Sequence, residues 1–534
     1  MSEKNYNLAF PFYQQSLERP EATALWVDGA YYSYAQISEQ ASRIAAWLQQ
    51  RCDGKLRRVA ILCSRSLGAY QGILGSSWAG ACYVPLNPKF PEKRLAAILQ
   101  QAEPQALIVD TAALELLSPA LITLLPNDCI LVTNGPAVTL YGTDIDGAKQ
   151  LEGASPLEEP VAVGPDAEAY LIFTSGSTGE PSGVVITTGN LNFAIETLTR
   201  RYPFHSEDRF SQFFELSFDF SVMDLFVPWR VGASTYVVPE AQKLGPGRFI
   251  AEHCLTVWSC VPSIIAMMGR MGMLKPNVLP SLRFALFSGE TLLAEAAKLW
   301  QDAAPNCLIV NLYGQTEAPI GSLAQNYDAS APVTEENAGV AIGAAFDGVY
   351  VAIVDSNGQF IEGEGVGELV LSGPHVANGY LGDSQRSAAK FKSLTHPRYG
   401  ERIWYHTGDL ARRDANALFH YLCRSDNEIK ISGHRVVLEG VERYLRQCSA
   451  CAEVGVTAQQ GSTGSVESLV GFVVAPQIDV AAIKQAMLAY LPRPIIPKRI
   501  FAVDELPLNA NGKLDRQQLQ MLASQLTVKQ KRPS

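Results

Sequence analysis

A short segment of small and hydroxylated residues, "FTSGSTGEPSG" at 173–183, has the composition of a loop that binds an anion. Gly176, Gly179 and Gly183 let the backbone approach a ligand closely, because glycine lacks a Cβ atom. Successive backbone N–H groups in such a turn form a concave anion site. The hydroxyl donors of the segment are Thr174, Ser175, Ser177 and Thr178. Composition alone leaves a flexible Ser/Gly turn as an equally good interpretation.

The flanks of this loop distinguish it from a P-loop. The apolar run "AYLIFT" before it and "GVVIT" after it both predict strands, which gives strand–loop–strand. A P-loop instead leads into a helix and ends in Gly-Lys-Ser or Gly-Lys-Thr, a motif that is absent here. Ser182 stands where a phosphate-binding loop is expected to carry a cation.

The elements that must position this loop belong to two domains. From about residue 20 to 420, strand-like runs such as "RRVAILCS", "QALIVD", "CILVTN" and "NCLIVNLYG" alternate with amphipathic helices such as "YAQISEQASRIAAWLQQ". This alternation predicts an α/β domain with largely parallel sheets. After "RSDNEIKISGHRV" a short α+β segment follows, with "VERYLRQC" and "VAAIKQAMLAYL" as helices and "SLVGFVVA" as a strand. We therefore predict an N-terminal core over 1–425 and a C-terminal lid domain over 426–534.

Bulk properties narrow the class of protein. At 534 residues the chain exceeds one ordinary core, so two or more domains are expected. A net charge of -10 and a pI near 5.4 argue against a nucleic-acid scaffold. No apolar run reaches membrane-spanning length, and "MSEKNYNLAF" lacks the features of a signal peptide. The ten cysteines show no framework spacing, and the one close pair, Cys448 and Cys451, is expected to be free thiols at a helix end. A cytoplasmic location fits these features best.

Seven motifs occur in the order found in the adenylate-forming superfamily, which comprises acyl-CoA ligases, luciferases and the adenylation domains of nonribosomal peptide synthetases. "TSGSTGEPSGV" resembles the signature loop of that superfamily, and "NLYGQTEA" resembles its Tyr-Gly-x-Thr-Glu motif. The other matches are "AGACYVPLNPKFPEKRL", "GELVLSGPHVANGYL", "YHTGDLARR", "CRSDNEIKISGHRV" and "LPLNANGKLDR". Together they span nearly the whole chain, so coincidence is a poor explanation.

The resemblance implies a reaction and a set of ATP-binding residues. Adenylation joins a carboxylate to the α-phosphate of ATP and expels pyrophosphate, so the site must offset charge and hold two anions in line. By resemblance, Glu317 binds Mg²⁺, Thr316 contacts phosphate, and Lys513 bridges the reacting carboxylate and phosphate. The implied contacts to adenine and ribose are Asn311 at the adenine edge, Tyr313 stacked on the base, Asp409 on the ribose hydroxyls and Arg424 in support. Asp426 corresponds to the hinge at which the lid domain rotates.

Several positions depart from the motifs of the family. Ser182 replaces the usual loop lysine, Thr188 replaces a frequent histidine, and Cys423 and Glu428 replace the usual glycine and glutamine of the hinge motif. The loop lysine contacts phosphates, whereas Lys513 and the metal serve the reacting centre. Losing one charge-assisted contact should cost about 1.5–3 kcal/mol. We therefore expect weaker ATP binding and an active site.

The segment "FFELSFDFSVMDLF" resembles the part of amino-acid adenylation domains that receives the substrate's α-ammonium group, and here the receiving residue is Asp219. A buried carboxylate needs a cationic partner, which favours an amino or imino acid over a fatty acid. A helix-start aspartate is the structural alternative. The pocket positions carried over from the family are Phe220, Met223, Ser259, Leu286, Ser288, Leu312, Ile320 and Gly321. None of these is charged, so we expect a small neutral side chain, with L-proline first and alanine second.

The chain ends soon after Lys513, so we expect the acceptor to be the phosphopantetheine thiol of a separate carrier protein, with coenzyme A as the alternative. The resulting hypothesis is an AMP-forming amino-acid–carrier protein ligase of natural product biosynthesis. Rivals on the same fold are a D-alanine or L-alanine carrier protein ligase and an acyl-CoA synthetase. A rival of another class is a degenerate nucleotide-binding partner, which Ser182 and Thr188 suggest and which the presence of Lys513 and Glu317 opposes.

Overall fold

The computed structural model describes residues 5–52, 54–125, 129–133, 138–140, 143–175, 180–424, 428–431, 434–451, 453–461, 466–507 and 514–530. Two compact units make up the chain. The larger unit comprises Met1–Pro88, Ile98–Phe173 and Gly183–Cys423, and the smaller unit comprises Lys89–Ala97, Thr174–Ser182 and Arg424–Ser534. The boundary that the sequence predicts at Asp426 lies outside the described residues.

A six-stranded sheet carries the glycine-rich loop at one edge. The strands run in the order β10 (Pro181–Thr187), β9 (Glu168–Ser175), β4 (Cys82–Leu86), β3 (Arg58–Leu62), β5 (Ala106–Asp110) and β6 (Ile130–Thr133). The five strands from β9 to β6 are parallel, and the central ones are apolar and buried throughout. Such continuous apolar runs are expected of parallel strands that are covered on both faces.

A nine-stranded sheet forms the second layer of the larger unit. Its order is β19 (Ala344–Ala345), β16 (Ala318–Tyr327), β15 (Leu308–Gln315), β14 (Phe284–Phe287), β13 (Val257–Cys260), β11 (Arg209–Gln212), β12 (Ser234–Val237), β1 (Thr23–Val27) and β2 (Ala30–Ser33). Strands β15, β14, β13, β11, β12 and β1 are parallel, and antiparallel strands close both edges. Ligand sites of α/β proteins lie beyond the carboxyl ends of such parallel strands.

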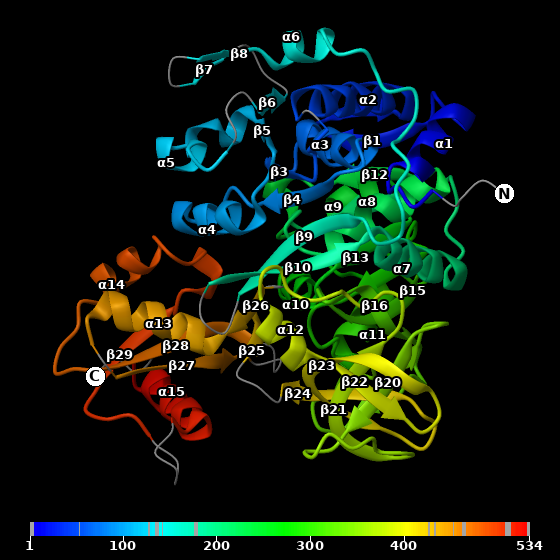
Figure 1. The fold of residues 1–534 in the computed structure, drawn as a ribbon. Coiled ribbons are helices and arrows are strands. Elements are labelled where there is room, and N and C mark those ends of the chain that lie inside the picture. The colour runs from blue at the N-terminus through cyan, green and yellow to red at the C-terminus, as the bar shows by residue number, and fades with distance from the viewer. Residues whose placement is uncertain are drawn as a thin grey trace. The chain divides into compact units, whose positions relative to one another are not determined.

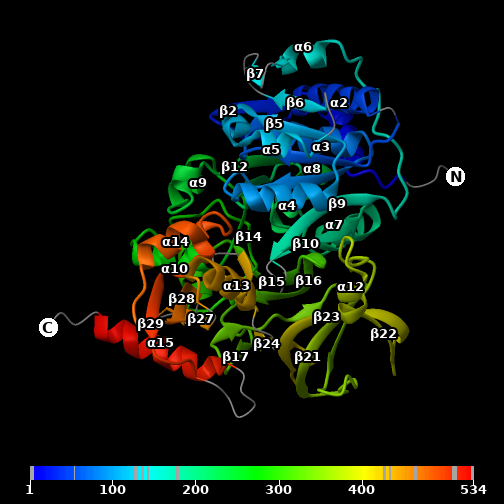
Figure 2. The same ribbon diagram turned by 60° about the vertical axis from the view of Figure 1, so that its left-hand side comes forward.

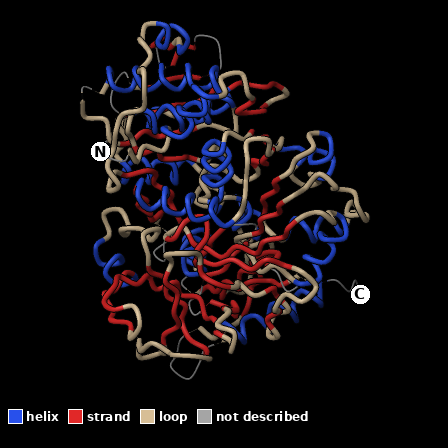
Figure 3. The backbone as a smooth tube through the Cα atoms, turned by 90° about the vertical axis from the view of Figure 1, so that its right-hand side faces the viewer, coloured by secondary structure: helices blue, strands red, loops and turns tan. Residues whose placement is uncertain are grey.

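Helices alternate with these strands along the chain, and Figure 3 distinguishes the helices from the strands by colour. The helices of this unit are α1 (Phe10–Glu18), α2 (Tyr34–Arg51), α3 (Leu67–Trp78), α5 (Pro119–Ile122), α6 (Gly147–Glu152), α7 (Thr188–Arg201), α8 (Phe220–Val231), α9 (Gly247–Glu252), α10 (Ser263–Arg270), α11 (Ala294–Ala303) and α12 (Ser384–Lys390), and α4 (Glu92–Ala102) begins in the smaller unit. Figures 1 and 2 show α2 and α3 side by side next to β3 and β5. Gly75 allows this close packing, because a Cβ atom there would lie 2.6 Å from Cγ2 of Ile44. The predicted α/β character is confirmed.

An antiparallel sheet follows in the chain, and sequence alternation did not predict it. Its path is β20 (Tyr350–Val354), β21 (Gly365–Ser372), β23 (Gly400–Arg413) and β22 (Phe391–His396), and β24 (Phe419–Arg424) also pairs with β23. A cluster around the fully buried Trp404 packs one face of this sheet. Two short hairpins, β7 (Val138–Leu140) with β8 (Thr143–Ile145) and β17 (Val333–Thr334) with β18 (Gly339–Val340), complete the unit.

The smaller unit is α+β, as the sequence predicts. Its sheets are β27 (Val454–Gln460), β28 (Val466–Val474) and β29 (Arg499–Val503), and the hairpin β25 (Glu428–Ile431) with β26 (His434–Val437). Its helices are α13 (Leu438–Ser449), α14 (Val480–Met487) and α15 (Arg516–Gln530). Cys448 and Cys451, at the end of α13, are free thiols, as expected. None of the described helices combines the length and apolar character needed to cross a bilayer.

Candidate active site

The glycine-rich loop joins two strands, as the sequence predicts. β9 ends at Ser175 and β10 begins at Pro181. The hydroxyl of Thr174 donates to the backbone carbonyl of Ser182 at 3.4 Å, and both residues are buried. The remaining loop residues singled out from the sequence, Gly176, Ser177, Thr178 and Gly179, lie outside the described residues.

Asp409 lies at the centre of a buried polar cluster. It is 0% exposed on β23, and its Oδ2 accepts hydrogen bonds from the hydroxyl of Tyr313 and, at 2.6 Å, from Nε2 of Gln315. Gln315 is fixed in turn, because its Oε1 accepts from the hydroxyl of Tyr405 at 2.7 Å. Both Tyr313 and Gln315 belong to β15, so a strand of the nine-stranded sheet holds the carboxylate that β23 of the antiparallel sheet carries. The sequence motifs singled out Asp409 and Tyr313 but missed Gln315 and Tyr405.

Glu317 is a second buried carboxylate, in β15's turn into β16. It is 0% exposed, and its Oε1 accepts from the hydroxyl of Tyr380 at 2.6 Å. Its backbone carbonyl accepts from the N–H of Ala377 at 2.8 Å, and Thr316 beside it is partly exposed. Mg²⁺ keeps several waters and takes one or two carboxylates together with phosphate oxygens, so this donor set suits it. Within the described residues, no group of three or more His, Cys, Asp or Glu side chains gathers as a metal site.

Asn311 is committed to the backbone of a neighbouring segment. Its Nδ2 donates to the carbonyls of Val340 at 3.0 Å and Ala341 at 2.9 Å, and the residue is 3% exposed. These contacts fix the orientation of the carboxamide at the point where the parallel pairing of β15 with β14 ends.

Asp219 is the N-cap residue of α8, which ends at Gly232 with a left-handed φ of 74°. The side chain of Asp219 does not cap the helix, which removes the simplest structural explanation of an aspartate at this position. The charge of Asp219 acts on Tyr170 of strand β9. Burial first, and the negative charge of Asp219 second, raise the pKa of the Tyr170 hydroxyl well above its ordinary value.

The eight residues predicted to contact the substrate side chain, here called the side-chain set, are all buried. Ser259 and Leu286 pair in register on β13 and β14, whose carboxyl ends point to the same edge of the sheet. Phe220 and Met223 follow Asp219 on α8. The ring of Phe220 packs edge-on against the ring of Phe214, with 5.0 Å between the ring centroids. The exposed fractions of the seven side chains are Phe220 5%, Met223 1%, Ser259 1%, Leu286 0%, Ser288 6%, Leu312 3% and Ile320 2%.

Two members of the side-chain set have unusual surroundings. A Cβ atom on Gly321 would lie 3.3 Å from both Leu312 and Phe346, so neighbouring side chains already occupy the direction in which a larger residue would extend. Ile320 has φ of 67°. A β-branched residue in this left-handed region is strained by about 1–3 kcal/mol and is found where surrounding structure enforces it.

Asp224 is a buried carboxylate that the sequence motifs did not assign to the site. It is 0% exposed on α8, and its Oδ1 accepts from the hydroxyl of Ser259 at 2.5 Å while its Oδ2 accepts from the backbone N–H of Phe213 at 3.1 Å. Ser211 supports Ser259, whose N–H donates to the Ser211 hydroxyl at 3.0 Å. Burial raises the pKa of Asp224 to about 8, and the hydrogen bonds from Ser259 and the backbone oppose this shift.

One signal for Asp224 was present in the sequence. In "FSVMDLFVPW" it is the only charged residue of an apolar helical run, and such a residue must find polar partners when the helix is buried. No comparable signal marks Gln315 or Tyr380, because their partners come from segments 63 to 94 positions away.

The other predicted residues belong to the smaller unit. Arg424 is the last residue of β24. Asp426 and Lys513 lie outside the described residues, so their roles stay predictions.

Two family models match the chain. The model described as AMP-binding enzyme matches residues 12–381, and the model described as AMP-binding enzyme C-terminal domain matches residues 440–513.

Individual relatives and solved structures are similar to the chain over nearly its whole length. The dimodular nonribosomal peptide synthase of Bacillus subtilis (strain 168) is 31% identical over 527 residues, which are 97% of this chain and 21% of that protein. Syringomycin synthase SyrB1 of Pseudomonas syringae pv. syringae is 30% identical, over 95% of this chain and 80% of that protein. The crystal structure of the Vibrio cholerae adenylation domain AlmE with glycyl-adenosine-5'-phosphate superposes with a TM-score of 0.83 and 28% identity, covering 98% of this chain and 99% of that one. The chain thus spans about a fifth of the Bacillus relative and nearly all of the solved domain.

Proposed function

The chain belongs to the AMP-binding enzyme family, and we propose that it activates a small neutral amino acid with ATP as an aminoacyl-AMP and transfers it to the phosphopantetheine thiol of a separate carrier protein. The observation that carries the proposal is the position of Asp219 at the start of α8, directly before Phe220 of the buried, uncharged side-chain set. A carboxylate next to buried, uncharged side chains suits an amino acid, whose ammonium group and side chain need these two surroundings.

The buried polar residues supply the contacts that ATP requires. With Nδ2 of Asn311 committed to two carbonyls, its Oδ1 is the group that can accept the adenine amino proton. Asp409 is oriented by Gln315 and Tyr313, and a carboxylate fixed in this way accepts hydrogen bonds from ribose hydroxyls without reorganising. In this assignment the Tyr313 ring lies against the base while its hydroxyl holds Asp409.

The reacting centre must stabilise two anions. Glu317 is assigned to hold Mg²⁺, which when bound would neutralise phosphate charge, and Thr316 is assigned to contact phosphate. Lys513 is assigned to stabilise the negative charge that develops as the carboxylate oxygen bonds to the α-phosphorus, the bond between the α-phosphorus and the bridging oxygen to the β-phosphate breaks, and pyrophosphate leaves. In the second step the carrier thiol attacks the carbonyl carbon of the aminoacyl-AMP and AMP leaves.

L-proline is the first candidate substrate. Asp219 can accept both N–H bonds of a prolinium, and Phe220, Met223 and Leu286 suit a compact ring that buries apolar surface without losing rotamer freedom. Each methylene that a smaller substrate lacks forfeits about 1–3 kcal/mol of discrimination.

A smaller substrate is the second candidate, and the burial of the side-chain set favours it. No member with a side chain is more than 6% exposed, which leaves little surface for a ring to cover. Glycine or alanine needs less space, and the AlmE domain is described with a glycyl adenylate.

Amino-acid-dependent exchange of labelled pyrophosphate into ATP tests the proposal. The panel contains L-proline, L-alanine, D-alanine, glycine and a medium-chain fatty acid, with Lys513→Ala as the inactive control. We expect exchange with one or two small amino acids and none in the control. Exchange with the fatty acid would replace the proposal with an acyl-CoA synthetase. Absence of exchange with every acid of the panel would replace it with a degenerate nucleotide-binding protein. Radiolabel transfer to a holo carrier protein, compared with transfer to coenzyme A, tests the acceptor.

A further inference from the structure

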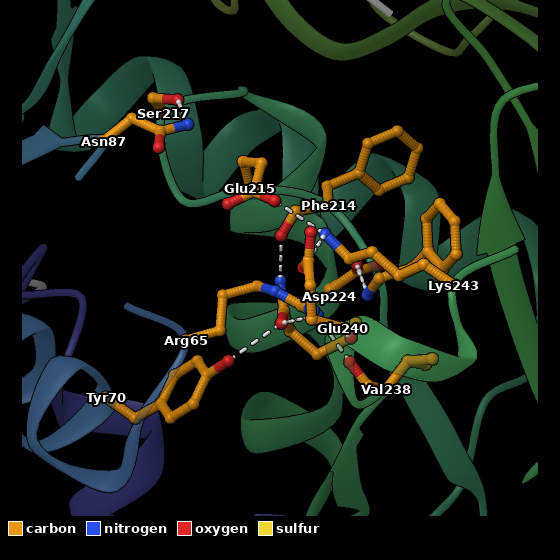
Figure 4. A network of polar contacts seen from close by, with 12 residues as sticks. Arg65, Tyr70, Asn87, Phe214, Glu215, Ser217, Asp224, Val238, Glu240 and Lys243 are labelled. Carbon is orange, nitrogen blue, oxygen red and sulfur yellow. Dashed lines mark hydrogen bonds and ion pairs between the residues drawn. The ribbon is translucent and has the colours of Figure 1, made fainter. Parts of the chain in front are cut away.

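The segment between β11 and α8, residues 213–218, directly precedes Asp219 and is held by hydrogen bonds and one ion pair with residues outside the segment. Figure 4 shows the polar network around it. Its first residue, Phe213, donates its N–H to Asp224 at 3.1 Å. The carbonyl of Phe214 accepts from Nε2 of Gln212 at 2.5 Å. Further along, Glu215 pairs with Lys243 at 2.7 Å.

The end of the segment is also fixed. The hydroxyl of Ser221, in the first turn of α8, donates to the carbonyl of Phe218 at 2.6 Å and lies 3.3 Å from that of Leu216. Asn87 contributes a longer bond of 3.4 Å to the Ser217 hydroxyl. Each residue from 213 to 218 therefore has at least one polar contact with a residue outside this segment.

Gln212 is itself positioned by a second layer. Its Oε1 accepts from the hydroxyl of Tyr70 at 2.8 Å and from Nη1 of Arg65 at 3.3 Å, and the residue is 0% exposed. Arg65 also donates to the carbonyl of Val238 at 2.7 Å, so it joins the carboxyl ends of β11 and β12. Figure 4 shows Arg65 and Tyr70 approaching this network from the same side.

Asp224 connects the segment to the side-chain set. One carboxyl oxygen holds Phe213 and the other holds Ser259, while the residue before Asp224, Met223, belongs to the side-chain set. In the described part of the chain no cation forms an ion pair with Asp224. Its carboxyl group is therefore held in place by its hydrogen bonds with the Ser259 hydroxyl and the Phe213 N–H.

We propose that Asp224 and Gln212 are positioning residues that hold residues 213–218, and through them Asp219, at a fixed distance from Ser259, and so determine how an amino-acid substrate is bound. The proposal rests on the proposed function in its last clause only. The contact with Ser259 fixes one end of the substrate site and the contacts with Phe213 and Phe214 fix the other. A displacement of about 1 Å in such a constellation lowers reactivity by as much as about 10²-fold.

The positioning role proposed for Asp224 requires its hydrogen bonds and not its negative charge. Asparagine at 224 can accept from the Phe213 N–H and donate to the Ser259 hydroxyl, so Asp224→Asn preserves both contacts. Leucine has a similar size and preserves neither. The raised pKa of Asp224 is consistent with a carboxyl that serves largely in its neutral form near pH 7.

The test uses the full chain with Asp224→Leu, Asp224→Asn and Gln212→Leu. The control is Asp208→Asn. Asp208 is as buried as Asp224, but it lies just before the first residue of β11, at the end of the strand away from residues 213–218. Amide hydrogen exchange of residues 213–219 is measured first, because it needs no substrate. We expect exchange about tenfold faster in Asp224→Leu and Gln212→Leu, and wild-type protection in Asp224→Asn and in the control.

Pyrophosphate exchange then separates positioning from general loss of structure. In Asp224→Leu and Gln212→Leu the KM for the amino acid should rise about tenfold or more, while the KM for ATP stays within about twofold. If Asp224→Leu does not fold, Gln212→Leu decides. Unchanged protection of 213–219, or equal rises in both KM values, overturns the proposal. Absence of amino-acid-dependent exchange in the wild type overturns the proposed function instead, and the hydrogen exchange still decides whether the segment is held as described.

Discussion

Two fully buried carboxylates lie at opposite ends of β11, and they are satisfied in different ways. Asp208, just before the strand, pairs with Arg283 at 2.5 Å and accepts from the Thr256 hydroxyl at 2.6 Å. Asp224, which contacts the residue just after the strand, accepts from a hydroxyl and a backbone amide. Both are 0% exposed.

We interpret this difference as one between a structural end of β11 and the end proposed to hold the substrate, which we call the functional end. Asp208 has its charge compensated by Arg283 and a further hydrogen bond from Thr256, so its burial is accounted for by structural partners alone. A buried acid without a cation is retained at a cost, as its pKa of about 8 indicates, and such exceptions to local consistency are expected near binding sites. The carboxyl end of β11 is also the end that ligand sites of parallel sheets use.

The largest effect is expected from Asp219→Asn at the functional end. Removing the charge that receives an ammonium group should lower kcat/KM for the amino acid by about 10²-fold or more, with little change in ATP binding. Steady-state pyrophosphate exchange measures the first quantity, and titration with a fluorescent ATP analogue the second. A similar loss of activity in Asp208→Asn would erase the contrast between the two ends.

At the structural end, Asp208→Asn should lower stability and spare activity. It removes the charge that pairs with Arg283, whose side chain is 35% exposed and can turn to water. The free energy of unfolding of the larger unit should fall by about 1–3 kcal/mol. Urea unfolding followed by tryptophan fluorescence gives this value. A variant that unfolds like the wild type would mean that the pair contributes nothing measurable.

Asp224 should make stability depend on pH in a specific direction. Its pKa is about 8 in the folded protein and about 3.9 when unfolded, so between these values the folded state holds a proton that the unfolded state has released. Stability therefore falls as pH rises through this window, by at most about 1.4 kcal/mol per pH unit. Arg65, which favours the charged form, reduces the slope, and burial keeps the pKa of Tyr70 and Cys260 above the window.

The measurement is the difference in urea midpoint between wild type and Asp224→Asn at pH 5 and pH 7.5. We expect the wild type to lose stability relative to the variant at the higher pH. Parallel behaviour of the two proteins would show that the carboxyl ionises as it does in the unfolded chain.

The smallest effect is expected from Asn87→Ala. Its bond to Ser217 is 3.4 Å long, at the weak end of hydrogen-bond geometry. The KM for the amino acid should rise about twofold. Pyrophosphate exchange at subsaturating amino acid detects such a change, and an effect as large as that of Gln212→Leu would show that the segment is held from Asn87 rather than from Gln212 and Asp224.

Much of the architecture could be predicted from sequence, because apolar periodicity encodes it locally. The strands flanking the glycine-rich loop and the helix α2 follow directly from such patterns. The antiparallel sheet from β20 to β24 was not predicted, because its register depends on pairing between distant strands rather than on local alternation.

The site divides in the same way. The motifs assigned roles to Asp219, Asp409 and Glu317. Gln315, Tyr380 and Asp224 stand in the same quoted segments without an assigned role, because they act through partners that only the fold brings near. Sequence also assigned Tyr313 to the base alone, while its hydroxyl bonds to Asp409. Hydrogen bonds between distant segments leave no periodic trace in a single chain.

The left-handed backbone of Ile320 has an evolutionary consequence. Enlarging a binding site by mutation usually removes packing and lowers stability, which limits how far specificity can drift. A change of Ile320 to glycine removes a bulky member of the side-chain set and also releases the strain of a positive φ. The lost packing and the released strain have opposite effects on stability. A substitution at this position can therefore enlarge the site for larger substrates with little loss of stability.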